Sequence, residues 1–193
     1  KRRKAWGGLL RVKDRDAGIK ILDEIAANYP DTELAELAQR AKADYYYARG
    51  EFELAEQEYA TLAKNYPRSR FHPMALLQSA RAALASYPGV KFDDKGLVEA
   101  QERYSQFATA YPAQAQQLDV PVILDEIAIK RADKTLFIGK FYQKTKKVGA
   151  ACYYYRQTIQ RWPDTAAAAE ARCRLTALGQ SEQAPVAAVS QAG

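Results

Sequence analysis

The sequence predicts an all-α solenoid built from helical hairpins, and three observations predict it. One motif recurs four times in the 193 residues, and helix-forming residues dominate, with glycine sparse at ten. The copies lie 37, 45 and 51 residues apart, a spacing typical of helical repeat arrays. They are Gly18–Leu22–Tyr29–Pro30, Ala55–Tyr59–Tyr66–Pro67, Ala100–Tyr104–Tyr111–Pro112 and Ala151–Tyr155–Trp162–Pro163.

Each copy combines a small residue, a large residue four positions later, and an aromatic–proline pair. A spacing of four places the small and the large residue on one helical face, where the small one allows a second helix to approach. The proline ends the helix about two turns later. Each copy therefore predicts the second helix of a hairpin.

The first two hairpins begin with helices of unequal clarity. Residues 1–13 supply the first helix of the first hairpin, with an apolar side formed by Trp6, Leu9 and Leu10. The second hairpin starts at about Thr32, which is suited to an N-cap. Its first helix ends at Ala48, Gly50 closes the turn, and its second helix runs from about Glu51 to Asn65.

The third hairpin begins near His72–Pro73, since proline suits a first helical turn. Its first helix ends before Tyr87, and an irregular insertion from Tyr87 to Asp94 separates it from the helix that begins near Lys95. Such an insertion is either a surface loop or a binding loop.

The fourth hairpin contains one long helix over residues 114–146. Pro121 either kinks it or marks its true first turn, with Asp119 as the cap. Gly139 inside this helix predicts a close contact with its neighbour. After Pro163, Thr165 can cap a final helix that covers the last hairpin.

The whole chain is expected to form one elongated domain over residues 1–178. Its hairpins span about 1–30, 32–67, 71–112 and 114–163, a capping helix spans 165–178, and a disordered tail spans 179–193.

The net charge is +6, and its most basic segment holds seven lysines and arginines against one acid between Lys130 and Lys147. Such a basic segment is most often a solvated helix face. Binding of an acidic protein partner is the next explanation, and binding of nucleic acid is the third. No apolar run reaches the length of a membrane span. The spacing of Cys152 and Cys173 fits no metal motif, so they are two buried free thiols or a disulfide.

No catalytic constellation is present, and no cofactor or metal is expected. The single histidine, His72, is a turn or cap residue in this interpretation. The thirteen tyrosines are the unusual group, because Tyr45–Tyr47 and Tyr153–Tyr155 cannot all be buried on one helical face. At least one tyrosine of each triplet should reach the surface, where it acts either in recognition or as interhelical filler.

The repeats resemble tetratricopeptide repeats, whose small, aromatic and proline offsets match Ala43, Tyr46, Ala55, Tyr59 and Pro67. Over roughly residues 15–178 the chain also resembles BamD-type outer-membrane assembly lipoproteins. The "HP" after the second hairpin, the long helix that enters a "GKFY" hairpin, and the closing "WPDT" carry this resemblance. It implies an all-α, tetratricopeptide-like helical-hairpin solenoid with a C-terminal capping helix.

The resemblance also implies a function. It is that of a non-catalytic, lipid-anchored scaffold at the periplasmic face of the outer membrane, which binds the periplasmic domains of the barrel-forming insertase through its C-terminal repeats. The N-terminal repeats would receive unfolded outer-membrane proteins. The family's acylated cysteine would precede Lys1 and matches no residue here. We assign partner binding to Lys140, Lys144, Lys146, Lys147 and Tyr154, and a substrate-peptide groove to Tyr45, Tyr47, Phe71 and His72.

Three other functions stay open. A periplasmic coordinator of cell division would need a coiled-coil segment, and the sequence has no heptad run. A cytosolic adaptor that grips a C-terminal carboxylate would use cations on its first helices, where the second repeat offers Arg40 but also the repelling Asp44. An enzyme lacks any convergent acid, base or metal set.

Overall fold

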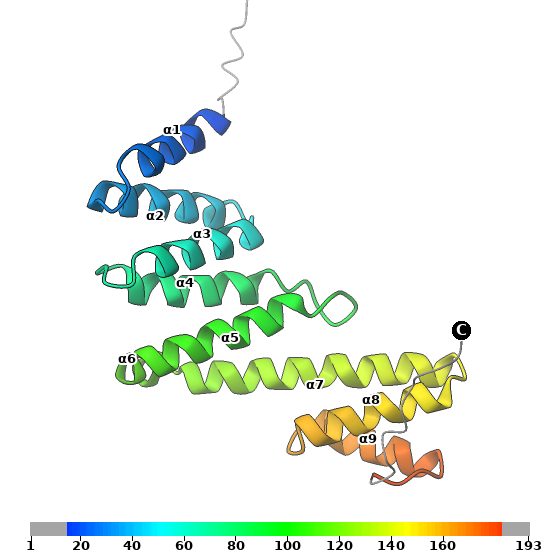
Figure 1. The fold of residues 1–193 in the computed structure, drawn as a ribbon. Coiled ribbons are helices and arrows are strands. Elements are labelled where there is room, and N and C mark those ends of the chain that lie inside the picture. The colour runs from blue at the N-terminus through cyan, green and yellow to red at the C-terminus, as the bar shows by residue number, and fades with distance from the viewer. Residues whose placement is uncertain (1–14, 183–193) are drawn as a thin grey trace, which may run out of the picture.

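The computed structural model describes residues 15–182, and all regular structure in this range is helical. The helices stack on one another in chain order from α1 to α5, and the long α7 then extends past the stack to carry α8 and α9 (Figure 1). An all-α, tetratricopeptide-like solenoid is therefore confirmed. The helices are α1 (Arg15–Asn28), α2 (Glu33–Ala48), α3 (Phe52–Asn65), α4 (His72–Ala85), α5 (Lys95–Ala110), α6 (Pro112–Gln117), α7 (Val120–Lys144), α8 (Val148–Arg161) and α9 (Ala166–Ala177).

Two threonines begin helices as the sequence predicts. The hydroxyl of Thr32 accepts a hydrogen bond from the backbone N–H of Ala35 at 3.3 Å, and that of Thr165 accepts one from Ala168 at 3.2 Å. Both residues have extended backbone conformations, as N-caps do. The prediction of a capping helix after Thr165 is confirmed, because α9 packs against both α7 and α8.

Of the two forms predicted for residues 114–146, one long helix kinked at Pro121 is wrong, and a helix whose first turn holds Pro121, with Asp119 at the cap position, is confirmed. The chain forms the short α6 and then α7, with a break at Asp119, whose φ of 52° is left-handed. A left-handed residue cannot continue a right-handed helix. Pro121 lies in the first turn of α7, where its missing N–H breaks no helical bond, while the Asp119 side chain makes no capping hydrogen bond.

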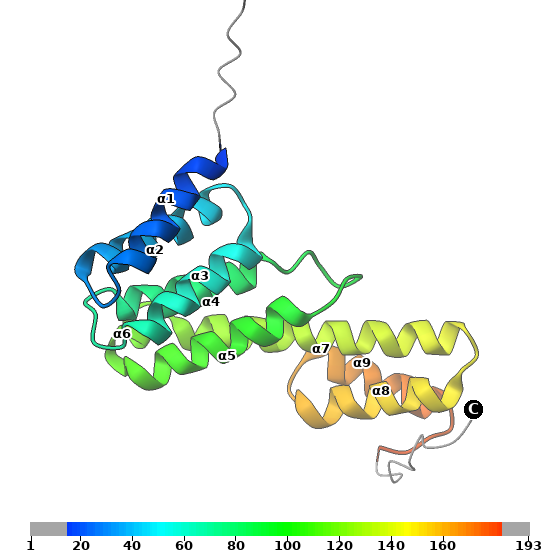
Figure 2. The ribbon, with the colours of Figure 1, turned by 45° about the horizontal axis from the view of Figure 1, so that its top comes forward.

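Helix α7 is shared by two hydrophobic cores. The larger core joins α3, α4, α5 and the first half of α7, and its last buried residue is Ile127. The second core begins at Ala132 and joins the rest of α7 to α8 and α9. The two halves of the molecule consequently meet along the middle of α7, as Figure 2 shows.

Gly139 is the point of closest approach in the second core. A Cβ atom built on it would lie 2.6 Å from Cε1 of Tyr155, a side chain with no exposed surface. The close contact that Gly139 predicts is confirmed, and the neighbour is the large residue of the fourth motif copy.

The two ends of the chain lie partly outside the described residues. The helix predicted over residues 1–13 lies wholly outside them, as does the tail from residue 183. The first residues of the predicted tail are instead held against α8. Arg156 donates hydrogen bonds to the backbone carbonyl of Ser181 at 3.1 Å and to the side chain of Gln180 at 3.4 Å, so the order of the chain continues past Gly179.

Candidate functional site

The turn between α7 and α8 carries three exposed lysines, Lys144, Lys146 and Lys147. Lys146 has a left-handed φ of 61°, and the N–H of Lys147 bonds to the carbonyl of Tyr142 at 2.9 Å, so the backbone of the turn is fixed. Among residues 15–182, no salt bridge involves any of the three. We call them the lysine tip, a cluster of charge free for a partner.

Lys140, also assigned to partner binding, lies one turn earlier on α7 and has a different environment. Its ammonium pairs with Glu170 of α9 at 2.7 Å, and Glu170 also pairs with Arg174 at 2.7 Å. The hydrogen bond from Lys140 is the main reason that the pKa of Glu170 is lowered, and burial opposes it. Lys140 therefore joins α7 to α9 through an internal ion pair.

Four aromatic rings lie beside the lysine tip, and we call them the aromatic ladder: Phe141, Tyr142, Tyr153 and Tyr154. Tyr142 stacks on Tyr154 with ring centroids 5.4 Å apart and planes 12° apart. Phe141 meets the edge of Tyr142 at 5.6 Å, and Tyr153 meets Tyr154 at 5.3 Å. Phe141 is 55% exposed and Tyr153 is 36% exposed, so the outer rings are open to contact.

Tyr154, the one ladder residue that the sequence assigned to partner binding, is half-buried between its neighbours. The other three residues were not predicted from the sequence as partner-binding residues. Their signal was the "FY" of the "GKFY" segment together with the tyrosine triplet, since the two segments face each other across a hairpin turn. Tyr155, the third of the triplet, is fully buried and donates a hydrogen bond to Gln143 at 2.6 Å.

The remaining cations of the basic segment have separate roles. Lys130 is exposed, whereas Lys134 is buried and donates hydrogen bonds to backbone carbonyls of the α4–α5 connection, to Val90 at 2.9 Å and to Phe92. Arg131 donates a hydrogen bond to Gln101 of α5. Some cations of this segment are thus solvated, and others form hydrogen bonds that hold α7 to neighbouring elements.

The residues assigned to a substrate groove form two groups. The ring of Tyr47 lies 5.4 Å from Phe52 and 6.5 Å from Tyr59, so it fills space between α2 and α3. Tyr45 is half-buried, and the guanidinium of Arg49 lies 5.4 Å from its ring. Both tyrosines belong to the C-terminal end of α2.

Phe71 and His72 begin α4 and have other neighbours. The guanidinium groups of Arg40 and Arg70 lie 5.1 and 4.8 Å from the Phe71 ring. Nδ1 of His72 lies 2.6 Å from the hydroxyl oxygen of Tyr111, and burial lowers the pKa of His72.

The two groups lie toward opposite ends of α2. The connection that precedes Phe71 is tied to α2 at Glu36, which accepts a hydrogen bond from Ser69. Glu36 precedes Tyr45 by nine residues, or about 14 Å of helix. The two groups therefore have no contact partner in common among the described residues, although Arg40, which contacts Phe71, lies only five residues before Tyr45 on α2.

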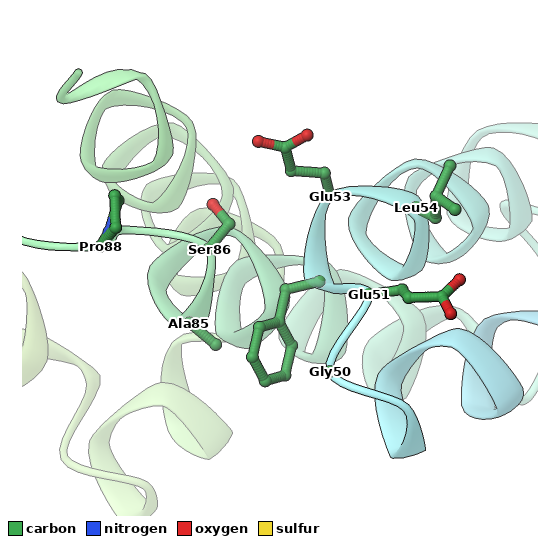
Figure 3. A pocket seen from close by; sticks show the side chains of 8 residues that line it. Gly50, Glu51, Glu53, Leu54, Ala85, Ser86 and Pro88 are labelled. Atoms are coloured by element: carbon green, nitrogen blue, oxygen red, sulfur yellow. The ribbon is translucent and has the colours of Figure 1, made fainter. Parts of the chain in front are cut away.

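A hollow of about 420 Å³ lies between the α2–α3 turn and the end of α4 (Figure 3). Ala85 and Ser86 approach it from the end of α4, and Glu51 and Glu53 approach it from the side of the α2–α3 turn. Its lining mixes apolar side chains with the polar side chains of Glu51, Glu53 and Ser86, and no residue of the assigned groove lines it. The lining residues are Gly50, Glu51, Phe52, Glu53, Leu54, Ala85, Ser86 and Pro88.

Within residues 15–182, no three histidine, cysteine, aspartate or glutamate side chains are arranged to hold a metal ion. Cys152 is buried, but Cys173 is exposed on α9, which corrects the prediction of two buried thiols, and both are free. In the same range, no helix has the length and apolar character needed to span a membrane.

Comparison with known proteins agrees with this architecture. No curated protein matches the chain. The model of a family described as outer membrane lipoprotein, YfiO, matches residues 8–184, which include every described helix. On this match over most of its length, the chain belongs to the YfiO family of outer membrane lipoproteins.

Proposed function

We propose that this chain is a non-catalytic scaffold of the β-barrel assembly machinery, lipid-anchored at the periplasmic face of the outer membrane. In this proposal the α7–α8 hairpin binds the periplasmic domains of the barrel-forming insertase. Family membership supports the general role, and the lysine tip supports the location of the docking surface.

The observation that carries the proposal is the pairing of the lysine tip with the aromatic ladder. Three lysines without an ion pair among the described residues attract an acidic surface and speed its approach. Exposed aromatic rings supply apolar contact area at low conformational cost, and tyrosine is enriched where protein interfaces bind most strongly. A hairpin with both features is suited to an acidic protein partner that has an apolar centre.

The test measures association with the purified periplasmic domains of the insertase. Reversal of the tip in Lys144→Glu, Lys146→Glu and Lys147→Glu should slow association at least tenfold at low salt and much less at high salt, because exposed charges are screened. The matched control reverses Lys20, Lys64 and Lys91, which are also exposed lysines without an ion pair in the described part of the chain.

The two triple variants carry the same change in net charge. A difference between their association rates therefore reports the charge of the lysine tip and not the net charge of the protein. Equal slowing by both would show that only net charge matters. Normal association of the tip variant at low salt would rule out the lysine tip as the docking surface.

Substrate capture by the N-terminal half belongs to the same proposal. Tyr45 is half-buried, and its ring contacts Tyr46 and Arg49, which lie on the same helix or just after it, so part of its ring remains open to an unfolded chain. A photoreactive residue at Tyr45 should crosslink to an unfolded outer-membrane protein, with one at Tyr29, an exposed tyrosine on the neighbouring connection, as the control. Crosslinks confined to α7–α9 would refute a receptor in the N-terminal half.

The alternative of a carboxylate-gripping cytosolic adaptor loses its main residue. Nε of Arg40 pairs with Asp44 at 3.4 Å, and Asp44 also accepts a hydrogen bond from Tyr59 at 2.5 Å. The cation that would grip a peptide is thus already neutralised on its own helix.

A further inference from the structure

Arg131 holds a half-buried positive charge at the junction of the two cores. It lies on α7 between Ile127, the last buried residue of the first core, and Ala132, the first of the second. Helix α5 and the end of α8 flank this stretch of α7 (Figure 2). At this junction, one cation of α7 contacts a side chain from each half of the molecule, Gln101 of α5 and Trp162 at the end of α8.

The contacts of Arg131 leave one edge of its guanidinium without a hydrogen-bond acceptor among the described residues. Nη1 donates a hydrogen bond to the side-chain oxygen of Gln101, and the guanidinium carbon lies 5.6 Å from the centre of the Trp162 ring. Nε is shielded from solvent and has no partner, and among the described residues no hydrogen bond uses Nη2. Nε and Nη2 form the edge of the guanidinium that binds a carboxylate through two parallel hydrogen bonds.

No carboxylate within residues 15–182 compensates this charge. Burial is the main reason that the pKa of Arg131 is lowered, while Asp94 attracts the charge without reaching ion-pair distance and Arg161 opposes it. Arginine stays charged in proteins, so the cost of removing it from water remains.

Other shielded cations of this protein are compensated. Arg103 of α5 pairs with the buried Glu56 at 3.0 Å, and Lys42 of α2 pairs with Glu58 at 2.8 Å. Lys134, one turn after Arg131, is satisfied by two backbone carbonyls. Within the described part of the chain, Lys134 also has no carboxylate partner, and Nε of Arg40 also has no hydrogen-bond partner, but Arg131 combines the two features, which calls for an explanation.

We propose that Arg131 is the centre of a site that binds a carboxylate of a polypeptide, with Arg161 and Trp162 as its other members. Arg131 receives the carboxylate on Nη2, and on Nε once the side chains that shield this atom from solvent move aside, while the exposed Arg161 adds a second positive charge. Trp162 offers an apolar ring to the carbon chain that bears the carboxylate.

This site is separate from the proposed docking surface. Lys144 lies thirteen residues after Arg131 on the same helix, which corresponds to about 20 Å. The carboxylate site uses only residues of the junction between the two cores. A negative result for the lysine tip would therefore leave the carboxylate site untouched, and the reverse also holds.

The test uses two small probes of the same shape. N-acetyl-leucine carries a carboxylate and an apolar side chain, and N-acetyl-leucinamide carries the same side chain without the charge. In NMR spectra of the ¹⁵N-labelled protein, the acid should shift the Nε–H signal of Arg131 and the indole N–H signal of Trp162. The amide should need at least tenfold higher concentration for equal shifts. It has one neutral oxygen acceptor, whereas the carboxylate has two charged oxygens that can accept from Nε and Nη2 together.

Three variants assign the effect to the guanidinium. Arg131→Met should abolish the preference for the acid at the Trp162 signal, Arg131→Lys should retain part of it, and Lys130→Met, an exposed neighbour, should retain all of it. A third probe, N-acetyl-glutamic acid α-amide, separates a side-chain carboxylate from a chain end. Binding of either acid supports the site and identifies the source of the carboxylate.

Equal shifts by acid and amide in the unmodified protein would overturn the proposal, and this result needs no variant to fold. A preference for the acid that survives in Arg131→Met would overturn it as well, because the charge that defines the site would then be irrelevant.

Discussion

Replacement of Gly139 by alanine tests the packing of the second core most sharply, because two physical effects oppose each other there. Alanine favours a helix interior over glycine by about 1 kcal/mol. The added Cβ, however, would lie 2.6 and 2.7 Å from two carbons of the Tyr155 ring. Carbon atoms normally pack at about 3.5–4.0 Å, so the ring or the helix must move.

Tyr155 cannot move cheaply. Its side chain is fully buried, and its hydroxyl is fixed by the hydrogen bond to Gln143. Overpacking in a tight core costs about 1–3 kcal/mol. With the gain in helix propensity subtracted, Gly139→Ala should lower the free energy of unfolding by about 1 kcal/mol, or the melting temperature by about 2–4 °C.

Gly149 is the matched control on the adjoining helix. A Cβ built on Gly149 meets nothing within 4 Å, so Gly149→Ala should raise stability by about 0.5–1 kcal/mol. Urea denaturation followed by circular dichroism measures both variants. If Gly139→Ala were as stable as Gly149→Ala, the argument from the Tyr155 contact would be refuted.

Three further predictions concern fastenings between helices. Lys134→Met leaves the carbonyls of Val90 and Phe92 without their donor, so amide hydrogen exchange in the α4–α5 connection should accelerate at least tenfold, while Lys130→Met leaves it unchanged. Thr165→Ala removes the N-cap of α9 and should cost about 1 kcal/mol in denaturant unfolding, against less than about 0.5 kcal/mol for the exposed Thr176→Ala. Glu170 has a pKa below its usual 4.5, so it stabilises the fold above that pH and the stabilisation is lost as pH falls through the lowered value. The free energy of unfolding, measured by denaturant at a series of pH values, should therefore fall less steeply with falling pH in Glu170→Gln than in the unmodified protein. An unchanged pH dependence would contradict the role of Glu170.

The positions of most helices follow from local chemistry, which is why they could be predicted from the sequence. Thr32 and Thr165 begin helices through hydrogen bonds to residues three positions away. The aromatic–proline pairs end α1, α3, α5 and α8 because proline cannot continue a helix. The break before α7 was predicted only as one of two alternatives, because Pro121 fits both a kink and a first turn and nothing in the sequence indicates the left-handed conformation of Asp119.

The roles of the charged side chains could not be predicted, because distant parts of the chain decide them. Lys134 binds carbonyls 42 and 44 positions away, and Lys140 pairs with an acid 30 positions away. Before the fold is known, both look the same as Lys144, which remains free. The aromatic ladder escaped for the same reason, because its two halves meet only when α7 and α8 pair.

Photocrosslinking in living cells tests the central claim most directly, since it reports contacts of the assembled protein. A photoreactive residue in place of Phe141, the most exposed ring of the aromatic ladder, should form its main adduct with the barrel-forming insertase. The same residue in place of Leu37, an exposed position on α2, should give no such adduct. Insertase adducts from Leu37 but none from Phe141 would contradict docking through the α7–α8 hairpin.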